Sequence, residues 1–260
     1  MKLAITGKGG VGKTTIAALL AKAFKAAGQQ VLAVDADPNA TLAASLGFPS
    51  PDAIPPVSEM ADLIQERTGV KPGTPGAIFK LNPRVEDIPD RFAVEHDGIK
   101  LLRMGAVKSG GAGCYCPENA FLRSLVAELL LGDHGTLIMD MEAGIEHLGR
   151  GTAQGVERLL IVVEPSQQSF ETAKRIRRLA GDIGLNRLAV VGNKSRSSRE
   201  TEVIRASVGA LPVWSVLPYD EGLRLAEQEG REVAPRLPDV KARIAELAQR
   251  ILRNEDNAPL

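Results

Sequence analysis

The string GKGGVGKTT at residues 7–15 combines the residue types that bind phosphate. It matches the spacing GxxxxGK[ST] with Lys13 and Thr14 near its end, and it lies between the strand-like KLAIT and a segment with helical spacing. Glycines let backbone N–H groups turn toward phosphate oxygens, the helix start adds positive potential, and the lysine reaches the β and γ phosphates. The strand and helix on either side disfavour a chance glycine turn. The predicted nucleotide contacts here are Gly9, Gly10, Val11, Gly12, Lys13, Thr14 and Thr15.

Three aspartates at the ends of apolar segments are candidates for the chemistry around that phosphate. Asp35 and Asp37 follow VLAVD in the string VDADPNA, and Asp140 closes TLIMD. Open parallel sheets place ligand-contacting groups at the carboxyl ends of their strands. We therefore expect Asp140, with the Thr14 hydroxyl, to hold Mg²⁺. A turn or helix-capping role is the alternative for the first two aspartates.

Lys8 is a second cation, directly after the first glycine of the loop. With it, GKGGVGKTT resembles the deviant Walker A ATPases, the family of MinD, ParA, the arsenical pump ATPase and the nitrogenase iron protein. In that family the early lysine crosses a dimer interface and supplies positive charge to the partner's nucleotide. The resemblance implies a homodimeric P-loop ATPase in which Lys8 acts in trans. A solvated loop lysine is the alternative.

The same resemblance implies roles for residues near the phosphates. Asp37 is the switch I residue that positions the attacking water, and Asp35 lies nearer to the Mg²⁺. The segment after Asp140 departs from the DxPAG pattern of many relatives, because Glu142 replaces the proline. Gly144 is therefore the expected sensor of the γ phosphate within switch II.

Recognition of the base is expected from two late loops. Asn193, in the string VGNK, resembles the family's adenine-contacting asparagine, although an exposed turn asparagine is the alternative. The backbone of Pro218, Tyr219 and Asp220 is expected to complete the purine pocket. Spacing alone does not distinguish ATP from GTP.

Cys114 and Cys116 are the only cysteines, and they lie two residues apart in GGAGCYCPENA. A closed tetrahedral thiolate site needs four donors, which a twofold dimer supplies from two such pairs. Buried inert thiols or a chance pair are the alternatives, and the glycines before the pair disfavour burial. Thiolates suit Ni²⁺ or Zn²⁺, and the sequence does not choose between them. His134 and His147 are left out, because a lone histidine is more often a surface residue.

At GCYCPENA and MDMEAGIEHLGRGT the resemblance narrows to one branch, the CooC-type maturation ATPases of nickel carbon monoxide dehydrogenase and of acetyl-CoA synthase. VDADPNA and EPSQQSFETAKRI also carry it, so the matching strings extend from residue 7 to residue 176. The resemblance implies ATP and Mg²⁺ as cofactors, Ni²⁺ or Zn²⁺ at the cysteines, and nickel insertion into the client's active-site cluster. The implied partners are a second copy of the chain and one of these two enzymes.

Two other functions use the same nucleotide chemistry. An electron-transfer ATPase similar to the nitrogenase iron protein also holds its cofactor on two cysteines per chain, but in that family the two lie in separate segments. A positioning ATPase of the MinD or ParA kind needs a membrane anchor or a basic DNA-binding face. Thirty-two basic residues balance 32 acidic ones, so we expect neither nucleic acid nor membrane as a partner. We expect a cytoplasmic protein, because no export signal precedes the first strand.

The elements that position these residues alternate regularly. Short apolar strands are predicted at 2–6, 31–35, 136–140, 158–163, 188–193 and 212–217, and helices at 13–27, 119–131, 168–182, 198–207, 220–229 and 238–252. Nearly continuous apolar strands indicate a parallel sheet buried on both faces. We therefore predict an α/β fold with a doubly wound, mostly parallel sheet in a single domain over 1–260. An irregular insertion at about 53–108, with a strand at 99–105, and a CxC loop at 110–117 interrupt it.

Overall fold

The computed structural model describes the chain except residues 75, 106–115, 146–147, 149 and 255–260, and the described strands form one sheet of eight. Their order is β3-β4-β2-β5-β1-β6-β7-β8, and every neighbouring pair is parallel except β3 with β4. The strands are β1 (Lys2–Gly7), β2 (Val31–Ala36), β3 (Val94–His96), β4 (Ile99–Arg103), β5 (Thr136–Met141), β6 (Arg158–Val163), β7 (Leu188–Ser195) and β8 (Val213–Pro218). The predicted mostly parallel sheet is confirmed.

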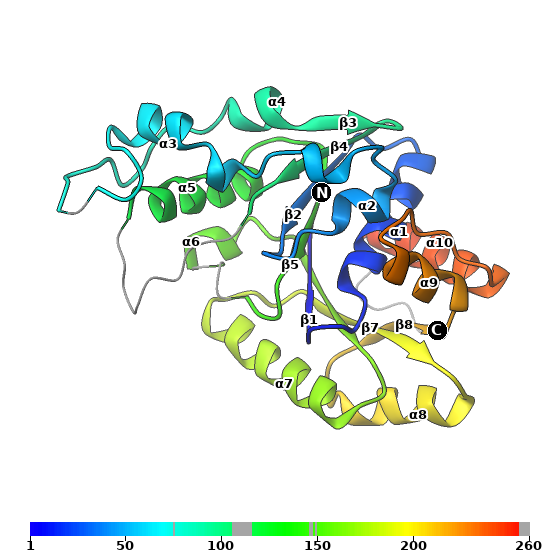
Figure 1. Cartoon of the computed structure of the whole chain (residues 1–260). Helices are drawn as coiled ribbons and strands as arrows, with labels where there is room; N and C mark the ends of the chain where they lie inside the picture. The colour runs from blue at the N-terminus through cyan, green and yellow to red at the C-terminus, as the bar shows by residue number, and fades with distance from the viewer. Residues whose placement is uncertain (75, 106–115, 146–147, 149, 255–260) are drawn as a thin grey trace.

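Helices cover both faces of this sheet (Figure 1). They are α1 (Lys13–Ala26), α2 (Leu42–Leu46), α3 (Ala61–Thr68), α4 (Ile88–Phe92), α5 (Pro117–Leu131), α6 (Arg150–Ala153), α7 (Gln167–Asp182), α8 (Ser198–Ser207), α9 (Glu221–Glu229) and α10 (Pro238–Leu252), with short 3₁₀ turns at Pro51–Ala53 and Val57–Glu59. One core lies under α3, α5, α7 and α8, and the other lies under α1, α2, α9 and α10. The fold is therefore the doubly wound arrangement that the sequence predicts.

The central strands are apolar throughout because successive side chains enter opposite cores. In β6, Leu159 and Ile161 pack under α7, whereas Leu160 and Val162 pack under α1. All four side chains have no exposed area. Two-sided burial explains why these segments do not alternate with polar residues as half-exposed strands do.

The segment predicted as an irregular insertion at 53–108 contributes to the sheet. It contains α3, α4 and the antiparallel pair β3–β4, and β4 extends the parallel sheet beside β2. Within the segment only the strand at 99–105 was predicted, and the structure ends it at Arg103. The short elements α2, α3, α4 and β3 lack enough repeats of any period to be recognised from sequence.

The carboxyl ends of the neighbouring strands β2, β5 and β1 lie side by side at one end of the sheet. Ile5 and Asp35 flank Asp140 on the neighbouring strands of this register. The loops that follow these three strands therefore meet, which is where doubly wound sheets bind ligands. In the part of the chain that the structure describes, no helix is long and apolar enough to cross a bilayer.

Candidate functional site

The glycine-rich loop connects the end of β1 to the start of α1, as its spacing predicts. Gly12 precedes the helix with φ 95°, a left-handed conformation that glycine adopts without strain. A Cβ on Gly12 would clash with Asn193 Nδ2, and a Cβ on Gly7 would clash with the Val162 carbonyl oxygen. No side chain caps the first turn of α1, so its backbone N–H groups face the loop. This arrangement can bind phosphate oxygens.

A hydrogen bond joins the first turn of α1 to the end of β5. Thr14 Oγ1 donates to Asp140 Oδ2 over 2.6 Å. Asp140 has no exposed area, and its Oδ1 has no hydrogen-bond partner among the described residues. A hydroxyl beside a carboxylate with an unused oxygen forms the kind of hard-oxygen pair that Mg²⁺ prefers. The two residues fit the predicted Mg²⁺ site, with nucleotide phosphates and water as the remaining ligands.

Burial raises the pKa of two neighbouring carboxyls at this edge. Burial is the main cause that raises the pKa of Asp140 to about 8 and that of Asp35 to about 6. The charge of Asp35 adds to the effect on Asp140, since the two face each other across β2 and β5. A divalent cation would favour the ionised forms and reverse this effect.

Asp35 also organises the segment that follows β2. Its Oδ2 accepts from the Leu42 N–H over 3.0 Å, and its Oδ1 accepts from the Asp37 N–H over 3.4 Å. These bonds hold the segment between β2 and α2 against the sheet. The turn or capping role, given above as the alternative for Asp35, is therefore seen in the structure. The role of Asp35 near Mg²⁺ stays a prediction.

Lys13 and Asp37 face each other across the loop. Lys13 Nζ lies 3.9 Å from Asp37 Oδ2, and both side chains are largely buried. The lysine thus has a carboxylate for a neighbour at the place where phosphates would bind. The position of Asp37 beside the loop is consistent with its predicted action on the attacking water, which stays a prediction.

Lys8 forms an ion pair within its own chain. Its Nζ lies 3.4 Å from Glu164 Oε1, just after β6, with side-chain exposures of 32% and 24%. A partly exposed pair of this kind contributes no more than about 1 kcal/mol. The sequence did not indicate Glu164 as the partner of Lys8, because no motif spacing relates two residues that lie so far apart in the chain.

Switch II is attached to β1 through a buried threonine. Thr6 Oγ1 donates to the Gly144 carbonyl oxygen over 2.7 Å and accepts from the Gly144 N–H over 3.2 Å. The Gly144 N–H must therefore leave Thr6 before it can bind a γ phosphate. The Thr6 hydroxyl also lies 3.2 Å from the Glu142 carbonyl oxygen, a second acceptor, and Glu142 lines a separate cavity. The sensing role of Gly144 stays a prediction.

The last residues of β7 hold the phosphate-binding loop in place through side-chain hydrogen bonds. The Asn193 side-chain amide donates to the Val11 carbonyl oxygen over 2.8 Å, and Lys194 Nζ donates to the Gly10 carbonyl oxygen over 2.6 Å. Lys194 has φ 61°, a conformation that costs a non-glycine residue energy and that the surrounding contacts must maintain. A base contact through the Asn193 amide oxygen is compatible with this bond and stays a prediction.

The other residues predicted at the base have structural contacts. Asp220 caps α9 by accepting from the Leu223 N–H over 3.1 Å and also accepts from the Leu237 N–H over 2.7 Å. The Tyr219 hydroxyl donates to Glu221 over 2.6 Å. Pro218 ends β8. No residue of this group lines the described cavity around the loop.

That cavity has a volume of about 310 Å³ and extends from the loop toward α2 and α9. Its predicted lining residues are Gly9, Gly10, Gly12, Lys13, Thr14, Thr15 and Asp37. The sequence analysis missed Asn39, Thr41, Ala44, Ser45, Ala226, Glu227, Gly230 and Arg231. The buried Val11 does not line it. The cavity therefore extends from the loop to α2 and the end of α9, an extension that only the packing of these helices reveals.

One of the two cysteines lies within the described residues. Cys116 is partly exposed and precedes the first turn of α5, where its carbonyl oxygen accepts from the Ala120 N–H over 3.1 Å. Cys114 lies outside the described residues, as does His147. Among the residues that the structure describes, no group of three or more His, Cys, Asp and Glu side chains is arranged to hold a metal.

Asn193→Ala tests the support of the loop. Because the substitution removes the donor to Val11, we expect affinity for both ATP and inorganic tripolyphosphate to fall about fivefold, the effect of one lost hydrogen bond of about 1 kcal/mol. Calorimetric titration measures both, with the exposed Asn186→Ala as the matched control. Unchanged affinity for tripolyphosphate would contradict the supporting role.

Asp140→Asn tests the buried carboxyl. Since the pKa of Asp140 rises from 3.8 unfolded to about 8 folded, the folded state binds the extra proton between these values. The free energy of unfolding should therefore decrease with rising pH across this range, and less steeply in Asp140→Asn. Chemical denaturation without nucleotide or Mg²⁺ measures both slopes, and equal slopes in the two proteins would refute the shift.

Comparison with known proteins agrees with this site. Residues 2–233 match the family described as CbiA, the CobQ/CobB/MinD/ParA nucleotide binding domain. The chain is 45% identical to the carbon monoxide dehydrogenase accessory protein CooC of Rhodospirillum rubrum over 88% of each chain. It is 46% identical to an uncharacterised ATP-binding protein of Methanocaldococcus jannaschii over 90% of this chain and 91% of the relative.

Solved structures of MinD and ParA proteins have the same fold as this chain. A ParA family ATPase from Chlorobium tepidum superposes with a TM-score of 0.68 at 20% identity, covering 96% of this chain and 98% of that one. A chain of the MinC:MinD cell division protein complex of Aquifex aeolicus superposes with a TM-score of 0.67 at 20% identity, covering 99% of this chain and 97% of that one. The chain therefore belongs to the CobQ/CobB/MinD/ParA nucleotide-binding family and is a P-loop ATPase of the CooC type.

Proposed function

We propose that this ATPase, as a homodimer, binds one Ni²⁺ or Zn²⁺ ion on Cys114 and Cys116 of both copies. ATP binding and hydrolysis then assist nickel insertion into the active-site cluster of carbon monoxide dehydrogenase or acetyl-CoA synthase. Similarity to the Rhodospirillum rubrum accessory protein over 88% of both chains supports this class of client. The observation that carries the metal role is the position of Cys116 directly before α5, a helix whose Asn119 and Arg123 line a cavity that Pro38 and Glu142 also line.

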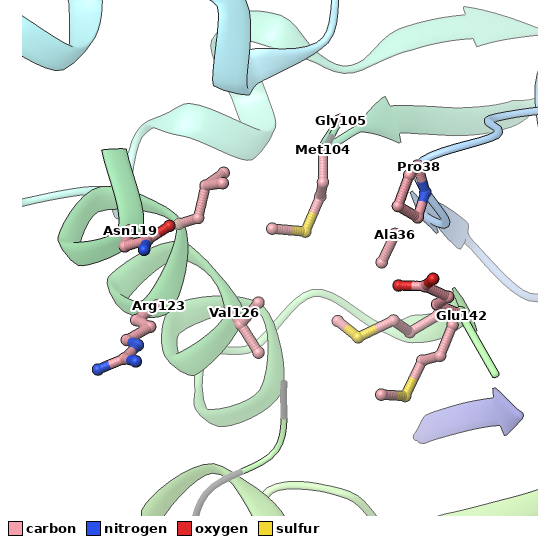
Figure 2. Close-up of a pocket in the computed structure, with 11 residues that line it drawn as sticks. Ala36, Pro38, Met104, Gly105, Asn119, Arg123, Val126 and Glu142 are labelled. Atoms are coloured by element: carbon pink, nitrogen blue, oxygen red, sulfur yellow. The ribbon is translucent and has the colours of Figure 1, made fainter. Parts of the chain in front are cut away.

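That cavity, of about 210 Å³, separates α5 from the nucleotide switches (Figure 2). Ala36 and Pro38 of switch I lie on one side with Glu142 of switch II, and Asn119 and Arg123 of α5 lie on the other. Its remaining lining residues are Met104, Gly105, Leu122, Val126, Met139 and Met141. Close-packed interiors resist movement, so an open space between two elements lets one shift against the other. A change in the switches can thereby reach α5 and the cysteine at its start.

The chemistry of the cysteines favours a metal shared between two chains. Two thiolates per chain are too few for a closed site, and a twofold axis supplies the tetrahedral set of four. The positive potential at a helix N-terminus favours a negatively charged thiolate at Cys116. A soft sulfur set suits Ni²⁺ or Zn²⁺ better than Mg²⁺, so the two metals of this protein would occupy chemically different sites.

Dimer closure gives Lys8 a second partner. In one chain its ammonium lies beside Glu164, and this partly exposed pair is weak enough to exchange for the phosphates of a partner's nucleotide. Closure would bring the two cysteine loops together at the same time. Metal binding and nucleotide binding are then linked, and each should strengthen the other by the same factor.

Lys8→Ala and Glu164→Gln test the crossing lysine. We expect Lys8→Ala to retain ATP binding and to lose ATP-dependent dimerisation and hydrolysis, because the charge supplied in trans is gone. Glu164→Gln should dimerise with ATP at least as readily as the wild type, since it releases Lys8 without changing the shape of its neighbour. Light scattering and phosphate release measure these properties. Dimerisation and hydrolysis by Lys8→Ala would overturn the assignment.

Cysteine substitution tests the proposed function. Anaerobic protein is titrated with Ni²⁺ and with Zn²⁺, with and without ATP, and the bound metal is counted per dimer. We expect one ion per dimer in the wild type, tighter with ATP, and none in Cys114→Ala/Cys116→Ala. The double variant should still bind ATP, which shows that it is folded. Metal binding that is unchanged in the double variant, or a brown iron–sulfur chromophore in the purified protein, would contradict the proposal.

A further inference from the structure

Lys194 is a third lysine at the phosphate-binding loop, in addition to Lys8 and Lys13. Its Nζ donates to the Gly10 carbonyl oxygen over 2.6 Å. Gly10 lies in the middle of the loop and has φ 79°. Lys194 does not line the cavity around the loop. Its side chain therefore contacts the backbone of the loop and not the space in which a ligand would lie.

The backbone of Lys194 is in a conformation that a lysine disfavours. At φ 61° the Cβ of an L-residue approaches the following carbonyl oxygen, which costs energy. The other described non-glycine residues with positive φ are Asp97 and Asn254, two types that tolerate this region better. The pairing of β7 with β8 also shifts register between Gly192 and Ser195. Such an irregularity redirects a side chain, and here the redirected side chain reaches the loop.

The ammonium of Lys194 also differs from the other two in its electrostatic surroundings. Lys8 lies beside Glu164 and Lys13 lies beside Asp37, so a carboxylate partly balances each of these charges. Lys194 forms no ion pair among the described residues, and its bond to the loop is made to an uncharged oxygen. The positive charge of Lys194 is therefore available to attract a polyanion to the loop.

The hydrogen bonds from β7 determine which way the peptide groups of the loop face. Lys194 holds the carbonyl oxygen of Gly10, and Asn193 holds that of Val11. In a trans peptide the N–H points away from the C=O, so these bonds direct the N–H groups of Val11 and Gly12 to the opposite side. Successive N–H groups that face one side form a concave anion site of the kind found in phosphate-binding loops.

We propose that Lys194 is a positioning residue for the binding of nucleotide phosphates. Its ammonium holds the Gly10 carbonyl oxygen, so that the N–H groups of the loop stay turned toward the phosphates, and its charge strengthens their attraction to the loop. The strained backbone at φ 61° is what brings this ammonium to the loop. The role lies within one chain, and it depends neither on the metal nor on Lys8 reaching a partner's nucleotide.

Two variants that lack the ammonium separate the side chain of Lys194 from its backbone. Lys194→Met keeps the length of the side chain and the strained φ, whereas Lys194→Gly removes the side chain and the strain. We expect Lys194→Gly to resist chemical denaturation better than Lys194→Met. Both should bind tripolyphosphate about tenfold more weakly than the wild type in calorimetric titrations, since both lack a charged donor. Wild-type affinity in Lys194→Gly would overturn the proposal.

The dependence of affinity on salt tests the charge of Lys194. Tripolyphosphate is titrated at several NaCl concentrations, and its affinity should fall less steeply with salt in Lys194→Met than in the wild type, because one positive charge is missing. The matched control is Lys71→Met, an exposed lysine beyond the end of α3, which should bind like the wild type. Equal slopes in Lys194→Met and the wild type would contradict the electrostatic part of the proposal.

Hydrolysis kinetics distinguish positioning from catalysis. In Lys194→Met the KM for ATP should rise while kcat stays within about twofold of the wild type, because Lys194 contacts the loop and not the reacting groups. Phosphate release over a range of ATP concentrations measures both constants. A fall in kcat with an unchanged KM would show that Lys194 acts on the reaction itself and would overturn its assignment as a positioning residue.

Discussion

The hydrogen bond from Thr14 to Asp140 is the contact on which the nucleotide site depends. It joins the first turn of α1 to the end of β5. The phosphate-binding loop and the strand that precedes Glu142 and Gly144 are therefore held in a fixed position relative to each other. Asp140 can occupy that position because the sheet places it between Ile5 and Asp35 in the register of three parallel strands. Burial raises the pKa of its carboxyl, and a bound cation would lower that pKa by stabilising the ionised form.

Charged residues around the loop form a set of contacts that phosphates can replace. Lys13 faces Asp37 and Lys8 faces Glu164, while Thr6 occupies the N–H of Gly144. Each is a contact within one chain, made by a group whose predicted partner is a phosphate. Nucleotide binding would therefore replace these contacts with contacts to phosphate oxygens. This exchange gives a physical basis for a switch, because the groups released from one partner must move to reach the next.

Sequence reasoning predicted much of this arrangement and missed identifiable parts. The loop at 7–15 and Asp140 follow from a short motif and from the end of an apolar strand, so local sequence places both. Asn193 was predicted to contact the adenine, which stays a prediction, and the structure adds a hydrogen bond from its amide to the Val11 carbonyl oxygen that the sequence did not indicate. Glu164 and Trp214 carried no signal, since their partners lie far along the chain.

The sequence by itself determined the alternation of the longer strands and helices, the chemistry of the phosphate-binding loop and the family. These depend on periodicity and on motifs within about ten residues, where spacing alone restricts the backbone. Tertiary structure alone decided that α2 and α9 line the cavity around the phosphate-binding loop, that Lys8 pairs with Glu164, and that two guanidiniums stack on Trp214. Such contacts join segments that meet only when the sheet forms, so their geometry is set by packing and not by spacing.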